Sequence, residues 1–451
     1  MAKQRDFTEG NIWRHLVLFS GPIILTNLLQ TSYQFIDSLW IGNLLGVSAL
    51  GSVAIASAIV FTVLSFVIGI NNSALTILSQ QKGKKNEQRL KRYLNAFVVV
   101  LTSLSLLLSV IGYLFSEELL VLLGTPDNIM SGANAYLRIN FIGIWFLFGY
   151  NFISTVLRSL GDSKTPLRFV AVAVFANAAL DPLFISVFGW GIQGAAYATI
   201  ISQGGAFLYG LVYVLYKQLA PFCIPHMPSK KEVFLILQLG IPAGLQMSVI
   251  SAGSAAIMSV VTVFGESVVA GYGAVLRLNS LVMLPATSLG TAVNSMAGQN
   301  IGVGKWDRVK AISRSGILYN LAVMMVLGIG AMIFARFGMQ LFIKDEAAVS
   351  FGATYLRIVA LCFPFLGINF VLNGIVRASG AMFQVLILNI ISFWILRYPF
   401  TFLFSHYFGE NGIAIGMGLS FIVSSGCAYG YYRYGKWRKK DLFHKGSMKS
   451  D

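Results

Sequence analysis

The chain is built from long apolar runs separated by short polar connections. A helix of about 20 apolar residues spans the hydrocarbon core of a bilayer. Only 11% of the residues are charged, whereas soluble domains usually carry about 25%. The sequence therefore excludes a water-soluble protein and predicts an all-α polytopic membrane protein. We expect twelve transmembrane helices near 14–40, 47–77, 94–115, 136–157, 166–188, 192–216, 234–263, 267–297, 312–335, 355–376, 382–405 and 411–432.

The connections between these runs alternate in charge. Positive residues that flank membrane helices stay on the cytoplasmic side. We therefore expect a multi-pass protein of the cell membrane with both termini in the cytoplasm, and the formal charge of +16 does not indicate nucleic-acid binding. The connections rich in Lys and Arg are 78–93, 158–165, 217–233, 298–311 and the tail after 432. Those poor in them lie around 41–46, 116–135, 189–191, 264–266, 336–354 and 406–410.

The two halves of the sequence are similar to each other at one constant offset. The segment Tyr-Leu-Arg-Ile at 136–139 recurs at 355–358, and the same offset carries Arg158 onto Arg377. Since each repeat holds six helices, the halves cross the membrane in the same sense, and we expect a pseudo-twofold axis along the membrane normal to relate them. Parallel repeats are one way of building a secondary transporter.

This repeat predicts a division of the chain into two lobes. The N-terminal six-helix lobe covers 1–216 and a cytoplasmic inter-lobe linker covers 217–233. The C-terminal six-helix lobe, with a basic cytoplasmic tail, covers 234–451.

Sequence signals for catalysis or for ATP hydrolysis are missing. Residues 298–305 have the wrong glycine spacing for a phosphate-binding loop, and Trp306 stands where Ser or Thr would bind magnesium. The four histidines and three cysteines are scattered along the chain. We therefore expect no enzymatic activity and no cofactor. An intramembrane enzyme, the less favoured alternative, would need convergent nucleophiles or metal ligands.

Two acids within the apolar runs of the first half are the clearest functional candidates. A charge at mid-membrane costs at least about 2.5 kcal/mol, so such residues need partners, water or protonation. Asp37 ends a polar stripe on one face of the first span, and Asp181 lies one helical turn after Asn177 in the fifth. Both acids are at a similar distance from the outer ends of their spans, so they could form one site. The alternative is a structural seam of hydrogen bonds between helices.

Other polar residues reach comparable levels in the first half. Tyr33, Asn151 and Thr199 carry hydroxyl or amide oxygens, which suit a hard monovalent cation together with carboxylates. The two acids could instead share protons and titrate as a coupled pair. A possible sodium site would therefore consist of Asp37, Asp181, Asn177 and Thr199.

The second half lacks these acids. The offset of the repeat carries Asp37 onto Ala256, and Tyr398 takes the place of Asp181 when the Asp-Pro and Tyr-Pro segments are aligned. Arg277 and Arg397 are interpreted as structural, anchoring carbonyl groups or sealing the lobe. The first half is therefore expected to be the cation-coupling lobe.

Together these features resemble the multidrug and toxic compound extrusion (MATE) family. The resemblance is carried by the turns QQKGKKNEQRLKR and GQNIGVGKWDRVK, by Asp37, and by the segment Asn177-x-x-x-Asp181-Pro182. Acids confined to the first half resemble the DinF-like branch. The seventh span, GIPAGLQMSVIS, has no acid where another branch carries one.

The resemblance implies a secondary active antiporter that exports organic, often cationic and amphipathic, compounds in exchange for protons or sodium ions by alternating access. The implied partners are small organic cations or amphipathic drugs and the lipid bilayer, and the protein is expected to act as a monomer. Pro22 matches a proline at which the first helix of related proteins bends. The family's coupling site falls on Tyr33, Asp37, Asn151, Asn177, Asp181 and Thr199.

Residues of the substrate cleft are harder to predict, because apolar cleft surfaces look like core in a sequence. Each methionine could equally be ordinary packing. A lipid-linked-precursor flippase of the same wider superfamily is the main alternative function, and a basic cleft would favour it. The tentative cleft residues are Gln30, Gln34, Met247, Met258, Met283, Asn369 and Asn373.

Overall fold

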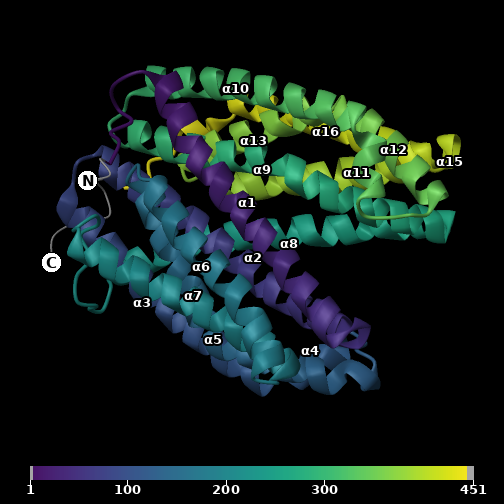
Figure 1. Ribbon diagram of the computed structural model, residues 1–451. Helices are drawn as coiled ribbons and strands as arrows, with labels where there is room; N and C mark the ends of the chain where they lie inside the picture. Colours follow the sequence, from purple (N-terminus) through teal and green to yellow (C-terminus); the bar gives the residue numbers. More distant parts are fainter. Residues whose placement is uncertain (1–3, 444–451) are drawn as a thin grey trace. The chain divides into compact units, whose positions relative to one another are not determined.

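The computed structural model describes residues 4–443, and every regular element in it is helical. Eleven helices or helix runs in this part are long and apolar enough to cross a membrane, and one bent pair would make a twelfth. The predicted all-α polytopic fold is thereby confirmed. The elements, drawn in Figure 1, are α1 (Ile12–Leu45), α2 (Val47–Gly83), α3 (Glu87–Leu114), α4 (Ser116–Leu122), α5 (Asp127–Ser159), α6 (Lys164–Pro182), η1 (Leu183–Val187), α7 (Gly191–Tyr216), α8 (Lys230–Val261), η2 (Thr262–Phe264), α9 (Glu266–Gly302), α10 (Trp306–Ile333), α11 (Ala335–Gln340), α12 (Glu346–Ala360), α13 (Phe363–Ala378), α14 (Met382–Ile390), η3 (Ile391–Arg397), α15 (Tyr398–Phe408), α16 (Asn411–Tyr434) and η4 (Lys436–Lys439).

The described chain folds into two compact units. Unit 1 contains residues 4–5 and 21–240, and unit 2 contains residues 6–20 and 241–443. The boundaries fall inside α1 and α8, beside Pro22 and Pro242. Both helices therefore begin in one unit and continue in the other, so the units are not contiguous in sequence. The assignment of ion coupling to the first lobe stays a prediction.

Hydrogen bonds explain why residues 6–20 belong to unit 2. Phe7 is buried, and its N–H donates to Oε1 of Gln299 at 3.0 Å. The carbonyl of Phe7 accepts from Nδ2 of Asn300 at 3.0 Å and from Nε of Arg308 at 2.9 Å. These long-range bonds hold the segment before α1 on helices α9 and α10.

Unit 1 is organised around α5, which contacts α2, α3 and α7 (Figure 1). Its inward residues, among them Phe148 and Phe152, are almost completely buried. In unit 2, α9 contacts α10, α12 and α13, and α13 also packs on α16. Val275, Met324 and Phe363 belong to the buried core of this unit.

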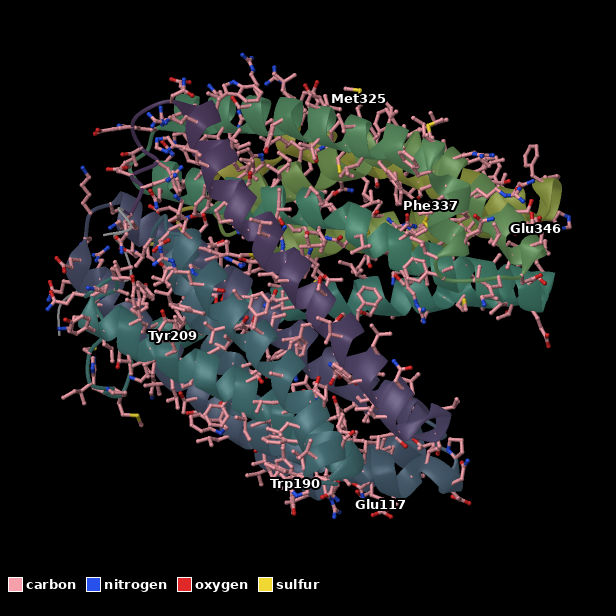
Figure 2. All side chains as sticks on the ribbon, viewed as in Figure 1. Glu117, Trp190, Tyr209, Met325, Phe337 and Glu346 are labelled. Carbon is pink, nitrogen blue, oxygen red and sulfur yellow. The ribbon has the colours of Figure 1, made fainter. Side chains whose placement is uncertain are left out.

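The outer surfaces of the helices are apolar. Trp190, Tyr209, Met325 and Phe337 are all exposed, and Figure 2 shows their positions on the outside of the helices. In a soluble protein such a surface would promote aggregation, whereas lipid chains solvate it. This distribution agrees with a multi-pass membrane protein.

The internal repeat is visible in the backbone. The offset that carries Tyr136 onto Tyr355 also carries the start of α4 at Ser116 onto the start of α11 at Ala335. Gly161 and Gly380, related by the same offset, have φ values of 90° and 86°. The sequence predicts loops where α4 and α11 occur, because helices of seven and six residues are too short to give a periodic signal.

The prediction of one continuous span near 355–376 is wrong in its bounds, because the helical region begins at Glu346, ends at Ala378 and is broken between α12 and α13. Helices α12 and α13 pass the criteria for a span together, but they are bent by 56° at the break between Ala360 and Phe363. Pro364 stands in the first turn of α13. Because proline has no N–H and disfavours helical geometry in the residue before it, it begins a new helix more readily than it continues one.

Two spans contain π-helical segments. Leu183–Val187 follows Pro182 at the end of α6, and Ile391–Arg397 precedes Pro399 near the start of α15. Such segments are rare in proteins, but those that occur often lie near functional sites. Buried charged residues described below are close to both: Asp181 of unit 1 lies two residues before the first segment, and Arg397 of unit 2 is the last residue of the second.

We predict that Gly161→Ala destabilises the protein by about 1–3 kcal/mol, the usual cost of a strained backbone position. Its φ of 90° favours glycine, and an added Cβ would lie 2.3 Å from the backbone oxygen of Arg5. Gly205→Ala in α7 is the control, since no atom lies within 4 Å of its added Cβ. Thermal unfolding of the detergent-purified variants measures both, and equal melting temperatures would refute the strain argument.

Candidate functional site

Asp37 of α1 and Asp181 of α6 meet inside unit 1. Both side chains are buried, and their carboxyl groups interact directly. Nδ2 of Asn177 donates to Oδ1 of Asp181 at 3.0 Å, as expected for residues one helical turn apart. The sequence places each acid on a polar face of an apolar helix, and the fold brings the two faces together.

Five oxygen atoms around this pair are buried and have no hydrogen-bond partner within residues 4–443. Tyr33 lies close enough to interact with Asp37, Asp181 and Thr199. Buried oxygen atoms are normally hydrogen-bonded or bound to a cation. The five are Tyr33 Oη, Asp37 Oδ1, Asn177 Oδ1, Asp181 Oδ2 and Thr199 Oγ1.

Neither carboxyl is neutralised by a basic side chain of the described chain. The ion pairs found there, such as Arg92 with Glu232 at 3.0 Å, lie elsewhere. Two unit charges about 4 Å apart repel by about 4 kcal/mol at a typical effective dielectric constant of about 20. A single positive charge, either a proton or a sodium ion, would relieve this repulsion.

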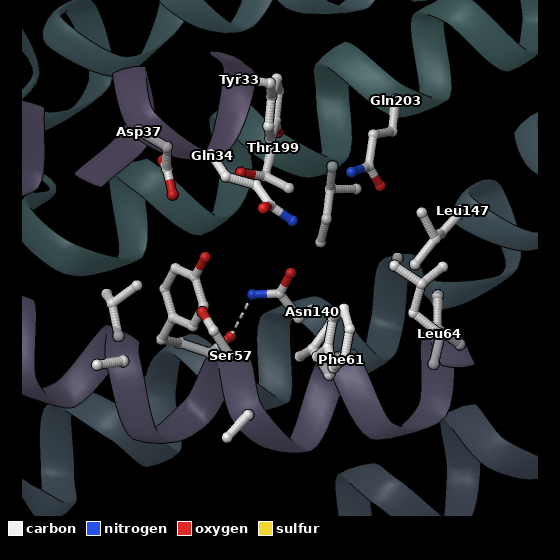
Figure 3. A pocket seen from close by; sticks show the side chains of 18 of the residues that line it. Tyr33, Gln34, Asp37, Ser57, Phe61, Leu64, Asn140, Leu147, Thr199 and Gln203 are labelled. Atoms are coloured by element: carbon white, nitrogen blue, oxygen red, sulfur yellow. Dashed lines mark hydrogen bonds between the residues drawn. The ribbon is translucent and has the colours of Figure 1, made fainter. Parts of the chain in front are cut away.

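Asp37 also faces a cavity of about 450 Å³ within unit 1. The walls come from α1, α2, α5 and α7, so the cavity lies between these four helices. Figure 3 shows Asp37, Gln34 and Thr199 on one side and Ser57 and Asn140 on the other. Asp181 and Asn177 do not line the cavity, and both are completely buried. The acid pair therefore has one member at the cavity wall and one in the protein interior.

Asn151 is not part of this arrangement in the structure. Its Nδ2 donates to the carbonyl of Leu147 in the same helix at 2.8 Å, and it does not line the cavity. Gln30 interacts with Tyr150 instead of with the acids. The cation-coupling role predicted for Asn151 and the substrate role predicted for Gln30 stay predictions.

The cleft residues predicted in the second half of the chain fall into two groups: the methionines are partly buried, and the asparagines form polar contacts. Met258 and Met283 are partly buried and pack against the hydrophobic core of unit 2, and Met247 is partly buried. Nδ2 of Asn373 donates to Oδ1 of Asn369 at 2.5 Å, and Asn369 donates to Ser424 at 3.2 Å. These asparagines form a bridge between α13 and α16.

Several polar residues that line the cavity were not predicted from the sequence: Ser57, Tyr136, Asn140 and Gln203. Tyr136 is buried and interacts with Ser57 and with both acids. Nδ2 of Asn140 donates to the carbonyl of Tyr136 at 2.9 Å, the dashed line in Figure 3. The recurrence of Tyr136 as Tyr355 in the repeat was the one signal that could have identified it.

Comparison with known proteins confirms the predicted resemblance. The MatE family model matches residues 22–183 and 242–403. The probable multidrug resistance protein YpnP of Bacillus subtilis is 60% identical over 98% of this chain and 99% of its own length. The FAD transporter of Shewanella oneidensis is 25% identical over 95% of this chain and 96% of its own length.

Solved structures support the fold. A multidrug resistance MATE family transporter of the MOP superfamily, solved in an outward-facing conformation, has a TM-score of 0.92 with 20% identity and covers 97% of this chain and 99% of that chain. The Vibrio cholerae transporter VcmN in its bent form has a TM-score of 0.90 with 22% identity, over 96% and 98% of the two chains. Membership of the DinF-like branch stays a prediction.

We predict that substitutions of the two acids are not additive in stability. Because the carboxyl groups interact, the effect of the Asp37→Asn, Asp181→Asn double variant on the free energy of unfolding should differ from the sum of the single effects by about 0.5–3 kcal/mol. SDS titration in mixed micelles measures these free energies. Asp162, which accepts hydrogen bonds from Thr165 in the turn between α5 and α6, provides the control pair with Asp37. Additivity for both pairs would show that the two acids are not coupled.

Proposed function

Because the chain belongs to the MatE family, we propose that it is a multidrug efflux transporter that exports organic, often cationic and amphipathic, compounds in exchange for protons or sodium ions. The relatives named multidrug resistance proteins support the substrate class. The coupling site of this proposal is the pair Asp37 and Asp181 with Tyr33, Asn177 and Thr199.

One observation carries the proposal of ion coupling: the cluster of buried oxygen atoms around the two acids that lack hydrogen-bond partners in the described chain. All its ligating atoms are oxygens from carboxyl, amide or hydroxyl groups. Such atoms suit a proton or a hard cation, whereas thiol and imidazole ligands favour transition metals. No resident metal or organic cofactor is part of the proposal.

The mechanism requires only that cation and substrate bind the two access states with different affinities. Loading the acids with a cation from outside removes negative charge at the cavity wall, where Asp37 lies. A cationic compound then loses an attractive partner and is released. When the protein opens to the cytoplasm, loss of the cation restores the negative charge, and the next cationic compound binds.

The direction of export depends on membrane orientation. We place both termini and the basic connections in the cytoplasm, because Lys and Arg accumulate there. In this proposed orientation the end of α2, the turn after it and the start of α3 would face the cytoplasm; they carry Lys82, Lys84, Lys85 and Arg89. The cavity in unit 1 adjoins the part of α1 that leads towards the opposite side of the membrane.

We predict that Asp37→Asn and Asp181→Asn each reduce gradient-driven accumulation of ethidium in proteoliposomes by about 5- to 150-fold, the usual range of coupling between two ligands. A proton gradient and a sodium gradient are imposed separately, and the gradient that drives the wild type identifies the ion. Glu118→Gln changes an exposed acid in α4 and should leave transport unchanged.

Folded Asp37 and Asp181 variants that transport like the wild type under both gradients would contradict the proposed coupling site. A wild type that moves no cation under either gradient, but scrambles a fluorescent lipid-linked precursor, would support the flippase alternative instead. Size-exclusion profiles verify that each variant is folded before its transport is compared.

A further inference from the structure

We propose that unit 2 contains a binding site for the carboxylate group of organic compounds, built around Arg397. The proposal goes beyond ion coupling, because it concerns a different unit and a ligand of opposite charge. It would extend the compounds that the protein recognises from cations to zwitterions.

Arg397 is a buried cation deep in a membrane-spanning helix run. It lies eleven residues before Phe408, the end of the span from Met382, which corresponds to about 17 Å of helix. Its side chain is only 7% exposed. A charge at this depth is costly and marks a functional site by default.

Aromatic rings enclose the guanidinium group from several helices. Its Cζ lies 3.7 Å from the ring centroid of Phe393 and 4.8 Å from that of Phe421 in α16. Tyr272 of α9 and Tyr355 of α12 are also within interaction range, with their rings packed edge to face at 5.7 Å. Ring faces stabilise the cation but accept no directed hydrogen bond from the edge of the guanidinium.

Hydrogen-bonding groups of Arg397 and Thr401 have no partner within the described residues. No hydrogen bond or ion pair of Arg397 occurs there, and its Nε is fully enclosed without a partner. This differs from the predicted role of Arg397 as an anchor of carbonyl groups. Thr401, one helical turn further, is fully buried, and its Oγ1 is also unmatched.

The helices around Arg397 offer no counter-charge near it. Glu266, Asp307 and Glu346, the acids in the helices of unit 2 that the structure describes, all lie in first turns. A carboxylate from a ligand would fit the edge of a guanidinium whose face is stacked on Phe393, because the planar N–H fork matches carboxylate geometry. The hydroxyl of Thr401 could donate a further hydrogen bond.

The internal repeat strengthens this interpretation. Tyr136 of unit 1 interacts with two acids, whereas Tyr355, its counterpart in the second repeat, interacts with Arg397. The repeat therefore keeps the buried tyrosine and reverses the charge beside it. A site of this polarity selects anionic groups, as the acid pair selects cations.

The test compares binding of rhodamine B, which has a free carboxylate, with binding of its ethyl ester. Fluorescence anisotropy with the purified full-length protein gives both dissociation constants. Arg397→Gln should weaken binding of the acid by about tenfold to a hundredfold, the loss of a hydrogen bond to a charged group. Binding of the ester should change by less than about twofold. Arg277→Gln removes an exposed arginine of the same unit and should change neither.

If Arg397→Gln does not fold, Thr401→Val tests the same site with a nearly isosteric change and should weaken only the acid, by several-fold. Equal affinities of the wild type for acid and ester, or equal losses of both in either folded variant, would overturn the proposal. This assay measures binding alone, so its result is independent of whether a proton or sodium gradient drives transport through Asp37.

Discussion

The structure depends on the cost of placing like charges in an apolar helix bundle. Asp37 and Asp181 are buried side by side, and Asn177 is the one hydrogen-bond donor from outside the pair found for either carboxyl in the described chain. Burying such a pair costs less when one carboxyl is protonated or when a cation lies beside them. In the coupling that we propose, the charge of the site would change whenever the proton or sodium ion leaves.

The two halves of the chain share one backbone architecture but carry side chains of opposite charge at corresponding places. Short helices and turn glycines recur at the same offset as the sequence repeat, so the backbone repeat is preserved. The residues beside the repeated tyrosine differ: acids in unit 1 and Arg397 in unit 2. Helices α1 and α8 each cross from one unit to the other beside a proline.

The spans, the repeat and the acid pair could be predicted because apolar runs, residue offsets and intramembrane charges are local signals. The break before Phe363 could be suspected from Pro364 but depends on packing. The orientation of Asn151 towards its own helix, and the placement of Ser57 and Asn140 opposite Asp37, follow from contacts between helices. The sequence pattern of a single helix does not reveal contacts between helices. The same limit explains why the aromatic surroundings of Arg397 were not expected from the sequence.

The most direct measurement of the central claim is cation release on substrate binding. Ethidium is added to the purified protein in weakly buffered detergent solution, with a pH indicator for protons and ²²Na⁺ for sodium. Because linkage is reciprocal, the wild type should release one of the two cations as the dye binds. The Asp37→Asn, Asp181→Asn double variant should bind dye without releasing either. Equal release by the folded double variant would contradict the claim that these acids hold the coupling ion.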